Sequence, residues 1–404
     1  MTSVTVQSSQ SGQTVNVPFT SAENLALAGQ IAFAISAEIA NGAATAAFSK
    51  DGPPPKIEHD QTGVFFQDTN GSTNLPRGYN AVVDTAAQAT IHAAGGNGQS
   101  ILSGNGNLTF FAAHGSGTVV TGGGRNNIQI SERDRGAWLI ATGNGNDTIS
   151  ALGGGNDTIR PGAGRNLITL GNGNDLLQLT GRDTVTAARG NDTIDATGAK
   201  STVIYGKSSH ITFVGGAGSA TIQGGRGSDT VYGGSGRLSV QGGTAGHNLL
   251  FAGTGVATLF GGGSGDQLYA QGSHAQSLFA GGCNETLSAA QSSGHVSLTG
   301  GSGRDQLIGG TGADTFIGGS GKATMTGGSG PDTFAFIKGS AGGRDVILNF
   351  TSADKVQLSG YGPNAVANAL ASEKLSHGSV TITLSDNTRI TFDGVTNLKS
   401  SNFV

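Results

Sequence analysis

The sequence predicts an all-β protein in which short parallel strands stack turn upon turn into a β-solenoid. Glycine occupies 72 of the 404 positions, whereas charged residues make up only 12%, which departs from the composition of an ordinary globular domain. From about residue 143 to residue 336, a glycine-rich turn, an acidic residue, one further residue and a large apolar residue recur about every nine residues. Repeats this short cannot bury a core alone, so they must stack on their neighbours.

Each part of the nine-residue pattern has a physical role. Glycine accepts left-handed backbone angles and allows the chain to approach an ion closely, and aspartate supplies the hard oxygen ligands that calcium prefers. The alternative is a flexible glycine-rich linker, but such a linker lacks a large aliphatic residue in every turn. The clearest segments are GNGNDTIS (143–150), GGGNDTIR (153–160), GNGNDLLQ (171–178), GGRGSDTVY (224–232) and GGSGRDQLIGGTGADTFIGG (300–319).

These segments resemble the RTX nonapeptide family, whose pattern is GGxGxD followed by any residue, a large apolar residue and any residue. The resemblance covers nearly half of the chain. It implies a parallel β-roll that binds several calcium ions between successive turns. The metal ligands that it implies are the aspartates at the acidic position: Asp147, Asp157, Asp175, Asp183, Asp192, Asp229, Asp266, Asp305, Asp314 and Asp332.

Two nonapeptides make one turn of such a roll, so the acidic positions alternate between two edges. One set is Asp157, Asp175, Asp192, His210, Asp229, Asn248, Asp266, Glu285, Asp305 and Ala323. The other set is Asp147, Asn166, Asp183, Ser201, Ala220, Leu238, Ala257, Gln276, His295, Asp314 and Asp332. Because the second set loses its ligands in the middle, we expect calcium along much of one edge and only near the ends of the other. Random decay of individual repeats is the alternative.

The chain divides into four predicted parts. Residues 1–94 form an N-terminal region with a strand and an apolar helix, and residues 95–142 form solenoid coils without calcium aspartates. Residues 143–340 form the calcium-binding β-roll, and residues 341–404 form a C-terminal β domain. The helix follows a capping-box spacing at Thr20 to Glu23 and ends near Asn41. It either packs within its own domain or forms a contact between subunits or with a surface.

The C-terminal part resembles the domain that carries the export signal of proteins secreted by bacterial type I systems. The matching residues are Arg344, Asp345, Ile347, Phe350, Asp354, Val356, Leu358 and Gly360, although Asn402 stands where an acidic residue is usual. The resemblance implies the type I secretion apparatus as a partner and a Gram-negative source. A β cap that closes the solenoid is compatible with this interpretation.

Several classes of partner and location are disfavoured by the composition. The formal net charge is −4 and no basic stripe is evident in the sequence, so we do not expect a nucleic-acid partner. No apolar run is long enough for a membrane-spanning helix, and the first residues lack a signal peptide. The single cysteine, Cys283, cannot form an intramolecular disulfide and is expected to be a small buried or turn residue.

The sequence contains no catalytic motif that predicts an enzyme. It lacks HExxH and a G-x-S-x-G elbow, and its histidines, including His59, are scattered. We therefore expect no catalytic residues and no enzyme, but a secreted protein at the cell surface that self-assembles as an S-layer, biofilm-matrix fibre or adhesin. The alternatives are a calcium-dependent protein that binds a cell-surface polysaccharide, and a β-helical polysaccharide lyase or epimerase using tyrosines such as Tyr232 and Tyr269.

Overall fold

The computed structural model of the protein describes residues 2–58, 61–282 and 284–404. The chain forms two compact units, which we call the N-terminal unit, ending at Ser209, and the C-terminal unit, beginning at His210. In each unit most strands pair in parallel with the strand two places further along the chain. Both units are therefore β-solenoids, and the predicted fold class is confirmed.

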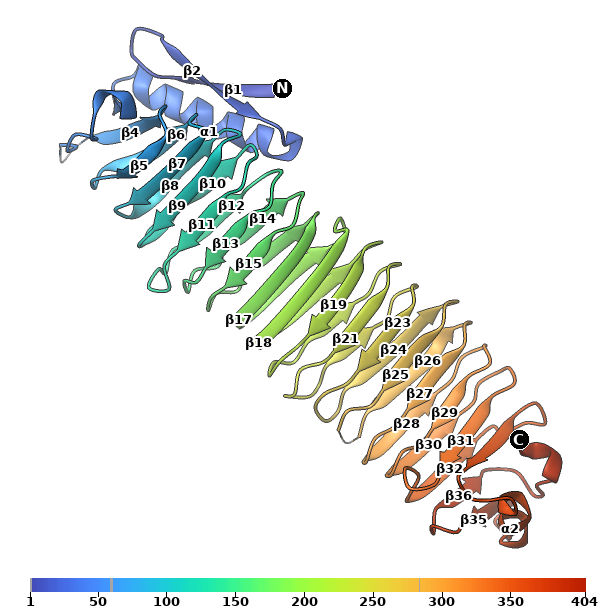
Figure 1. Cartoon of the computed structure of the whole chain (residues 1–404). Helices are drawn as coiled ribbons and strands as arrows, with labels where there is room; N and C mark the ends of the chain where they lie inside the picture. The colour runs from blue at the N-terminus through green and yellow to red at the C-terminus, as the bar shows by residue number, and fades with distance from the viewer. Residues whose placement is uncertain (1, 59–60, 283) are drawn as a thin grey trace. The chain divides into compact units, whose positions relative to one another are not determined.

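The strands of the N-terminal unit stack in successive coils (Figure 1), and aliphatic side chains fill the interior of these coils. Ile128, Ile149 and Ile168 lie opposite one another on β11, β13 and β15, and all three are fully buried. The strands are β3 (Ala44–Phe48), β4 (Thr62–Gln67), β5 (Gly71–Asn74), β6 (Tyr79–Asp84), β7 (Gln88–Ala93), β8 (Gly96–Ser103), β9 (Asn107–Ala112), β10 (Gly115–Thr121), β11 (Asn127–Ile130), β12 (Trp138–Ala141), β13 (Thr148–Ala151), β14 (Thr158–Gly162), β15 (Leu167–Leu170), β16 (Leu176–Leu179) and β17 (Arg182–Ala196). Parallel pairing already begins at β3 and β4, upstream of the coils that we expected from residue 95, because these strands keep the aliphatic residues without the glycine pattern.

A hairpin and a helix close the first coils of the N-terminal unit. Strands β1 (Thr2–Gln7) and β2 (Thr14–Phe19) pair antiparallel, and α1 spans Ala22–Ala40. The N-cap is Ser21, whose hydroxyl accepts the amide of Asn24, so the helix begins one residue later than the spacing at Thr20 suggested. Ile31, Ile35 and Ile39 pack in one cluster with side chains of the coils, so this face of the helix is buried within its own unit. A short 3-10 helix, η1 (Ser49–Asp51), follows β3.

The C-terminal unit repeats the same construction. Val231, Leu250 and Leu268 form one inward column on β20, β22 and β24. The element β18 (Ser201–Gly215) contains the residues at which the units divide. The following strands are β19 (Ser219–Gln223), β20 (Thr230–Tyr232), β21 (Leu238–Gln241), β22 (Leu249–Phe251), β23 (Ala257–Phe260), β24 (Gln267–Gly272), β25 (Gln276–Phe279), β26 (Thr286–Ser292), β27 (Val296–Thr299), β28 (Arg304–Ile308), β29 (Thr315–Ile317), β30 (Lys322–Thr326), β31 (Thr333–Ile337), β32 (Arg344–Leu348) and β33 (Lys355–Ser359).

The last residues of the chain cover the final coils of the C-terminal unit. Strand β36 (Arg389–Phe392) pairs in parallel with β32 and antiparallel with β35 (Ser379–Thr383), which also pairs with β34 (Lys374–Ser376). Helices α2 (Ala365–Ala371) and η2 (Ser400–Asn402) complete this region. Phe403 bridges to Val356, and the amide of Val404 donates to the Val356 carbonyl, so the chain end adds to the edge of β33.

Within the described ranges, no helix is long and apolar enough to cross a membrane.

Candidate metal centre

The glycines of the turns allow successive turns to pack directly on one another. In the N-terminal unit, a Cβ added to Gly173 would lie 1.8 Å from the carbonyl oxygen of Gly155. In the C-terminal unit, a Cβ on Gly224 would lie 1.7 Å from Oδ2 of Asp229. Only glycine fits at such distances, so the glycine pattern brings the backbone of one turn against a carboxylate and against the next turn.

All ten predicted metal ligands are buried at these turns. None of the ten aspartates is more than 3% exposed. In the N-terminal unit, Oδ1 of Asp175 accepts the amide of Asp157 at 2.8 Å, and Oδ1 of Asp192 accepts the amide of Asp175 at 3.2 Å. The other acidic column of this unit carries Asp147 and Asp183 on either side of Asn166. The structure thus aligns the predicted residues in columns, with one carboxylate oxygen holding the preceding turn.

The C-terminal unit contains two such turn columns, on opposite ends of the same strands. The turns before β20, β22, β24, β26, β28, β30 and β32 form the column that we call the acidic turn column. It carries Asp229, Asn248, Asp266, Glu285, Asp305, Ala323 and Asp345. The turns before β19, β21, β23, β25, β27, β29, β31 and β33 form the mixed turn column. It carries Ala220, Leu238, Ala257, Gln276, Val296, Asp314, Asp332 and Asp354.

Among the described residues, the second oxygen of many of these carboxylates has no hydrogen-bond donor. This holds for Oδ2 of five predicted ligands, namely Asp147, Asp175, Asp192, Asp229 and Asp266. A buried oxygen that lacks a partner costs about 1–3 kcal/mol, and a bound cation would remove that cost. The donor set consists of carboxylate oxygens beside backbone carbonyls, which is the set that calcium prefers. The residues present therefore fit calcium.

Three other predicted ligands use the second oxygen to close their own turn. Oδ2 of Asp183, Asp305 and Asp314 accepts a glycine amide of the same turn, at 3.2, 2.6 and 2.7 Å respectively. A carboxylate can accept a hydrogen bond and still bind a metal with its remaining lone pairs. These three residues are thus already positioned by the backbone.

Burial raises the pKa values of the buried carboxyls. Desolvation is the largest cause and raises the pKa of Asp147, Asp175, Asp183 and Asp229 to about 6. It raises the pKa of Asp157, Asp192 and Asp332 to about 7, where neighbouring aspartates in the column add to the effect. The pKa values of Asp266 and Asp314 also rise through burial. A cation beside these groups would favour the ionised form and reverse the shift.

Three acidic residues outside the ten named ligands lie in the same columns. Oδ1 of Asp345 accepts the amide of Ala323 at 2.8 Å, and its Oδ2 has no donor. Glu285 also has an oxygen without a donor, and burial together with the adjacent Asp305 raises its pKa to about 8. Asp354 differs, because its Oδ2 accepts the amide and the hydroxyl of Thr351. We had assigned Asp345 and Asp354 to the export domain because of the resemblance of that segment. In the structure they follow their neighbours in the columns by 22 residues instead of about 18.

Asparagine takes the acidic position in three turns and fixes its side chain in one orientation. Oδ1 of Asn248 accepts the amide of Asp229 at 2.8 Å, as an aspartate would. Its Nδ2 donates to the Gly243 carbonyl at 2.7 Å and to Oδ1 of Asp266 at 2.9 Å. In the N-terminal unit, Asn126 and Asn166 likewise donate to the next aspartate of the column, at 3.0 and 2.8 Å. In these turns, a hydrogen of the asparagine side-chain amide supplies partial positive charge. In several aspartate turns, a carboxylate oxygen without a donor stands at the same place.

The first five turns of the mixed turn column, from Ala220 to Val296, contain no acidic residue. The amides of Ala220 and Leu238 donate to backbone carbonyls of the next turn, at 2.9 and 3.0 Å. Nε2 of Gln276 donates to the carbonyls of Gly253, Gly255 and Gln271 at 2.7–2.9 Å. These turns are closed by hydrogen bonds within the protein.

Two positions in our sequence alignment of the turns are wrong by one residue. Thr212 lies opposite Thr230, so Ile211 and not His210 occupies the acidic position. Ser297 lies opposite Thr315, so the corresponding residue is Val296 and not His295. The aliphatic residue of each repeat, which must point inward, sets the register, and turn length varies to accommodate it.

Comparison with protein families now identifies the turns. Residues 142–177, 179–199, 212–237 and 299–334 match the RTX calcium-binding nonapeptide repeat in four copies. The chain contains RTX repeats. Nine of the ten predicted aspartates lie within the matched segments, and Asp266 lies outside them with the same buried geometry.

Two further comparisons add little. Comparison with curated proteins finds no match. Among solved structures, the extracellular lipase LipA from Serratia marcescens aligns with 17% sequence identity over 67% of this chain, with a TM-score of 0.25. The chain spans 45% of the length of that protein.

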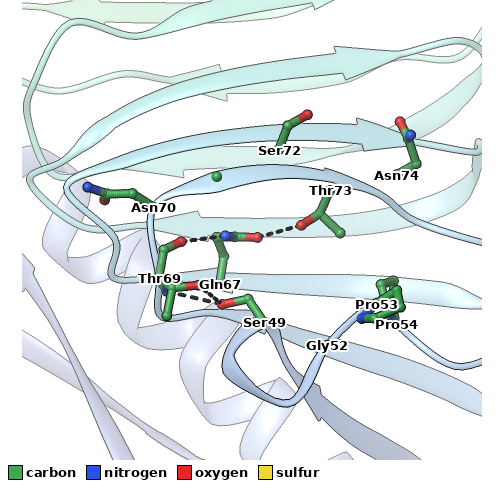
Figure 2. A pocket seen from close by; sticks show the side chains of 11 residues that line it. Ser49, Gly52, Pro53, Pro54, Gln67, Thr69, Asn70, Ser72, Thr73 and Asn74 are labelled. Carbon is green, nitrogen blue, oxygen red and sulfur yellow. Dashed lines mark hydrogen bonds between the residues drawn. The ribbon is translucent and has the colours of Figure 1, made fainter.

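A polar pocket beside the first coils of the N-terminal unit has no catalytic group among the described residues that line it (Figure 2). Its volume is about 430 Å³, and it is lined by serine, threonine, asparagine, glutamine, glycine and proline. The hydroxyl of Thr73 donates to Gln67, and Ser49 bonds to Thr69, so these polar groups are already paired. The lining supplies neither a base nor a nucleophile with an activated partner.

The tyrosines and histidines that we considered for catalysis have structural contacts. Tyr232 and Tyr269 stack on either side of Phe251, with ring centroids 5.2 and 4.8 Å apart. His92 stacks on Phe111, and Nδ1 of His274 bonds to a backbone carbonyl. The expectations for His59 and Cys283 concern residues outside the described ranges.

Proposed function

We propose that this protein is a secreted calcium-binding structural protein that folds outside the cell and self-assembles at the cell surface or in the extracellular matrix. One observation carries the proposal: columns of buried carboxylates in which one oxygen holds the preceding turn and the other has no donor. Calcium-binding repeats of the RTX type support it, because proteins with such repeats are typically secreted.

The carboxylate columns make folding respond to calcium concentration. At neutral pH an unfolded aspartate is ionised, and burying that charge without a partner is costly. Calcium, when bound, supplies the compensating charge, while Asp175, Asp192, Asp229 and Asp266 provide free oxygens. Low cytosolic calcium would leave the chain unfolded for export, and higher external calcium would stabilise the fold by mass action. The C-terminal resemblance supports the type I apparatus as the route.

Exposed apolar side chains support self-association. Phe33 on the outer face of α1 is 77% exposed. In the C-terminal unit, Phe260 is 43% exposed and stacks with Phe279 at 4.6 Å on an outward face of the coils. Aromatic groups exposed in this way favour contacts between protein surfaces. An S-layer, a matrix fibre and an adhesin would all use such contacts.

Electron microscopy with millimolar calcium and with chelator tests the proposal. Ordered sheets or filaments in calcium alone are expected. Deleting residues 1–50 is a poor test of α1, because it would expose the buried side chains of the coils that pack against the helix, such as Val64, Phe66 and Leu102. Phe33→Ser and the pair Phe260→Ser with Phe279→Ser keep the core, and we expect at least one of them to prevent assembly, with Tyr205→Ser as an exposed aromatic control. Dispersed, folded monomers of the unaltered protein in calcium would reject self-assembly while leaving calcium-dependent folding intact.

A further inference from the structure

Four basic side chains lie in one column along the last coils of the C-terminal unit. Arg304 lies opposite Lys322 in parallel register, and Arg344 lies opposite Arg389. The amide of Ala323 donates to Oδ1 of Asp345. These residues directly follow Lys322 and Arg344, so Lys322 and Arg344 also lie side by side. All four side chains are exposed. We call these residues the basic column.

The basic column has no partner within the part of the chain that the structure describes. None of its four side chains forms a hydrogen bond or an ion pair there. Asp305 and Asp345 are buried, and Asp386 accepts the hydroxyl of Tyr361 at 2.6 Å. Strands of adjacent coils are about 4.8 Å apart, and like charges directly opposite one another destabilise a sheet. An anion bound along the column would relieve this repulsion.

The basic column borders an open groove on the stacked turns. The groove has a volume of about 450 Å³, and its lining includes Arg304, Lys322, Asn284, Ser320 and Gly343. Serine, asparagine and backbone groups can bond to hydroxyls, while the basic groups attract anions. Within the described part of the chain, no aromatic side chain lines the groove, so these residues do not form the base-stacking surface that a single-stranded nucleic acid uses.

We propose that the basic column binds an anionic polysaccharide, whose carboxylate or sulfate groups lie along the coils. The inference takes from the proposed function only the extracellular location in which such a polymer is met. Each of Arg304 and Arg344 directly precedes a carboxylate of the acidic turn column. Calcium bound at those carboxylates would add positive potential beneath the groove. Binding is therefore stronger in the calcium-loaded protein than in the calcium-free one.

Binding of dextran sulfate to the full-length protein tests this inference. The polymer is titrated in millimolar calcium over a series of salt concentrations, with uncharged dextran in parallel, and circular dichroism reports folding in the same samples. The fourfold variant Arg304→Gln, Lys322→Gln, Arg344→Gln and Arg389→Gln is expected to bind about tenfold more weakly and to lose most of the salt dependence. The matched control Arg133→Gln, Lys200→Gln, Lys207→Gln and Lys374→Gln removes the same charge from exposed, scattered positions, and less than about a twofold change is expected.

Several outcomes would overturn the inference. Equal losses of affinity for dextran sulfate in the two fourfold variants would show that binding depends on the net charge of the protein and not on the basic column. Tighter binding of a single-stranded oligonucleotide than of dextran sulfate would point to a nucleic acid. Binding that persists in chelator after the circular dichroism signal is lost would show that the folded column is not needed. A protein that folds with calcium but does not bind dextran sulfate at low salt would reject the column and leave the proposed calcium-dependent folding standing.

Discussion

The two turn columns of the C-terminal unit share the same coils and the same aliphatic interior, yet they close their turns differently. In the acidic turn column, the amide of Asn248 bonds to the carboxylate of Asp266 in the next turn. Among the first five turns of the mixed turn column, the amide of Leu238 bonds instead to a backbone carbonyl of the next turn. Stacking therefore does not require a carboxylate. The carboxylates add buried negative charge, which a bound cation would compensate.

The cost of leaving out the cation differs between the columns accordingly. Asp229, Asp266, Glu285 and Asp345 each have a buried oxygen without a donor in the acidic turn column. The first turns of the mixed turn column have Ala220, Leu238 and Ala257 at the equivalent places, and the side-chain amide of Gln276 is hydrogen-bonded within the protein. Unpaired buried oxygens cost about 1–3 kcal/mol each, so we expect calcium to affect the acidic turn column more than the first five turns of the mixed turn column.

Removing calcium should have the largest effect. At neutral pH we expect chelator to abolish the cooperative thermal transition, because each ion held at a hundred times its Kd contributes about 2.7 kcal/mol and a domain is stable by only about 5–15 kcal/mol. Circular dichroism during heating, in calcium and in chelator, measures this. Magnesium in place of calcium is the control, since it fits rigid octahedral sites poorly matched to these turns. An unchanged melting temperature in chelator would contradict the conclusion that leaving out the cation costs more in the acidic turn column.

Acidification should have the next largest effect, and with opposite signs in the two states. The pKa values of Asp157, Asp192 and Asp332 are raised to about 7 in the fold, above an unfolded value near 3.8. A raised folded pKa contributes stability that is complete below the unfolded value and is lost as pH rises through the folded one. The calcium-free protein should thus be most stable below about pH 4 and least stable above about pH 7.

The calcium-loaded protein should behave in the reverse way, because calcium binds the ionised carboxylates and protons compete with it. Urea unfolding between about pH 4 and pH 8, with calcium and with chelator, should therefore give two stability curves that cross. Parallel curves would contradict the assignment of the buried carboxyls as the calcium ligands.

Two substitutions of Asp266 distinguish the effect of its charge on stability from the effect of its hydrogen bonds. Asp266→Asn keeps an oxygen for the amide of Asn248 but removes the charge, and Asp266→Ala removes both. In calcium we expect losses of about 1–3 kcal/mol for the first variant and more for the second. The slope of unfolding free energy against the logarithm of calcium concentration should fall by about one ion in both. A slope unchanged in Asp266→Asn would mean that this carboxylate does not bind calcium.

Much of the fold followed from the sequence because the aliphatic and glycine positions repeat locally. The inward columns and the burial of all ten predicted aspartates needed only the period. The N-terminal coils were harder to place, since β3 and β4 lack the glycine pattern. Ile211 and Val296 were displaced by one residue in the predicted turns because turn length varies while the inward aliphatic residue holds its position.

The finer features of the site depend on three-dimensional placement. Which carboxylate oxygen lacks a donor depends on backbone geometry that no motif encodes. Asp345 was missed as a column member because its turn is longer than the others. The basic column was invisible as a stripe, since Arg344 and Arg389 are 45 residues apart (389 − 344) and become neighbours only when β36 pairs with β32.

Loss of the Gln276 amide should destabilise the mixed turn column independently of calcium. Gln276→Leu leaves three backbone carbonyls without their donor, and we expect a loss of about 2 kcal/mol. The slope of unfolding free energy against the logarithm of calcium concentration should stay the same, because no cation ligand is removed. Urea unfolding at several calcium concentrations measures both quantities. A change in slope similar to that of Asp266→Asn would show that both columns bind calcium along their whole length.

Asn248→Asp should have the smallest effect on stability in calcium and the most specific one on calcium uptake. The substitution puts an oxygen where Nδ2 now donates to Gly243 and to Asp266, so two carboxylates face each other without a hydrogen between them. Repulsion should lower stability at low calcium by about 1 kcal/mol. A bound ion should offset the loss and raise the slope by up to about one ion. Asn387→Asp, at an exposed turn, adds the same charge and should leave the slope unchanged. A lower stability at every calcium concentration, with no change in slope, would mean that the asparagine turn has no room for an ion even when its ligand is restored.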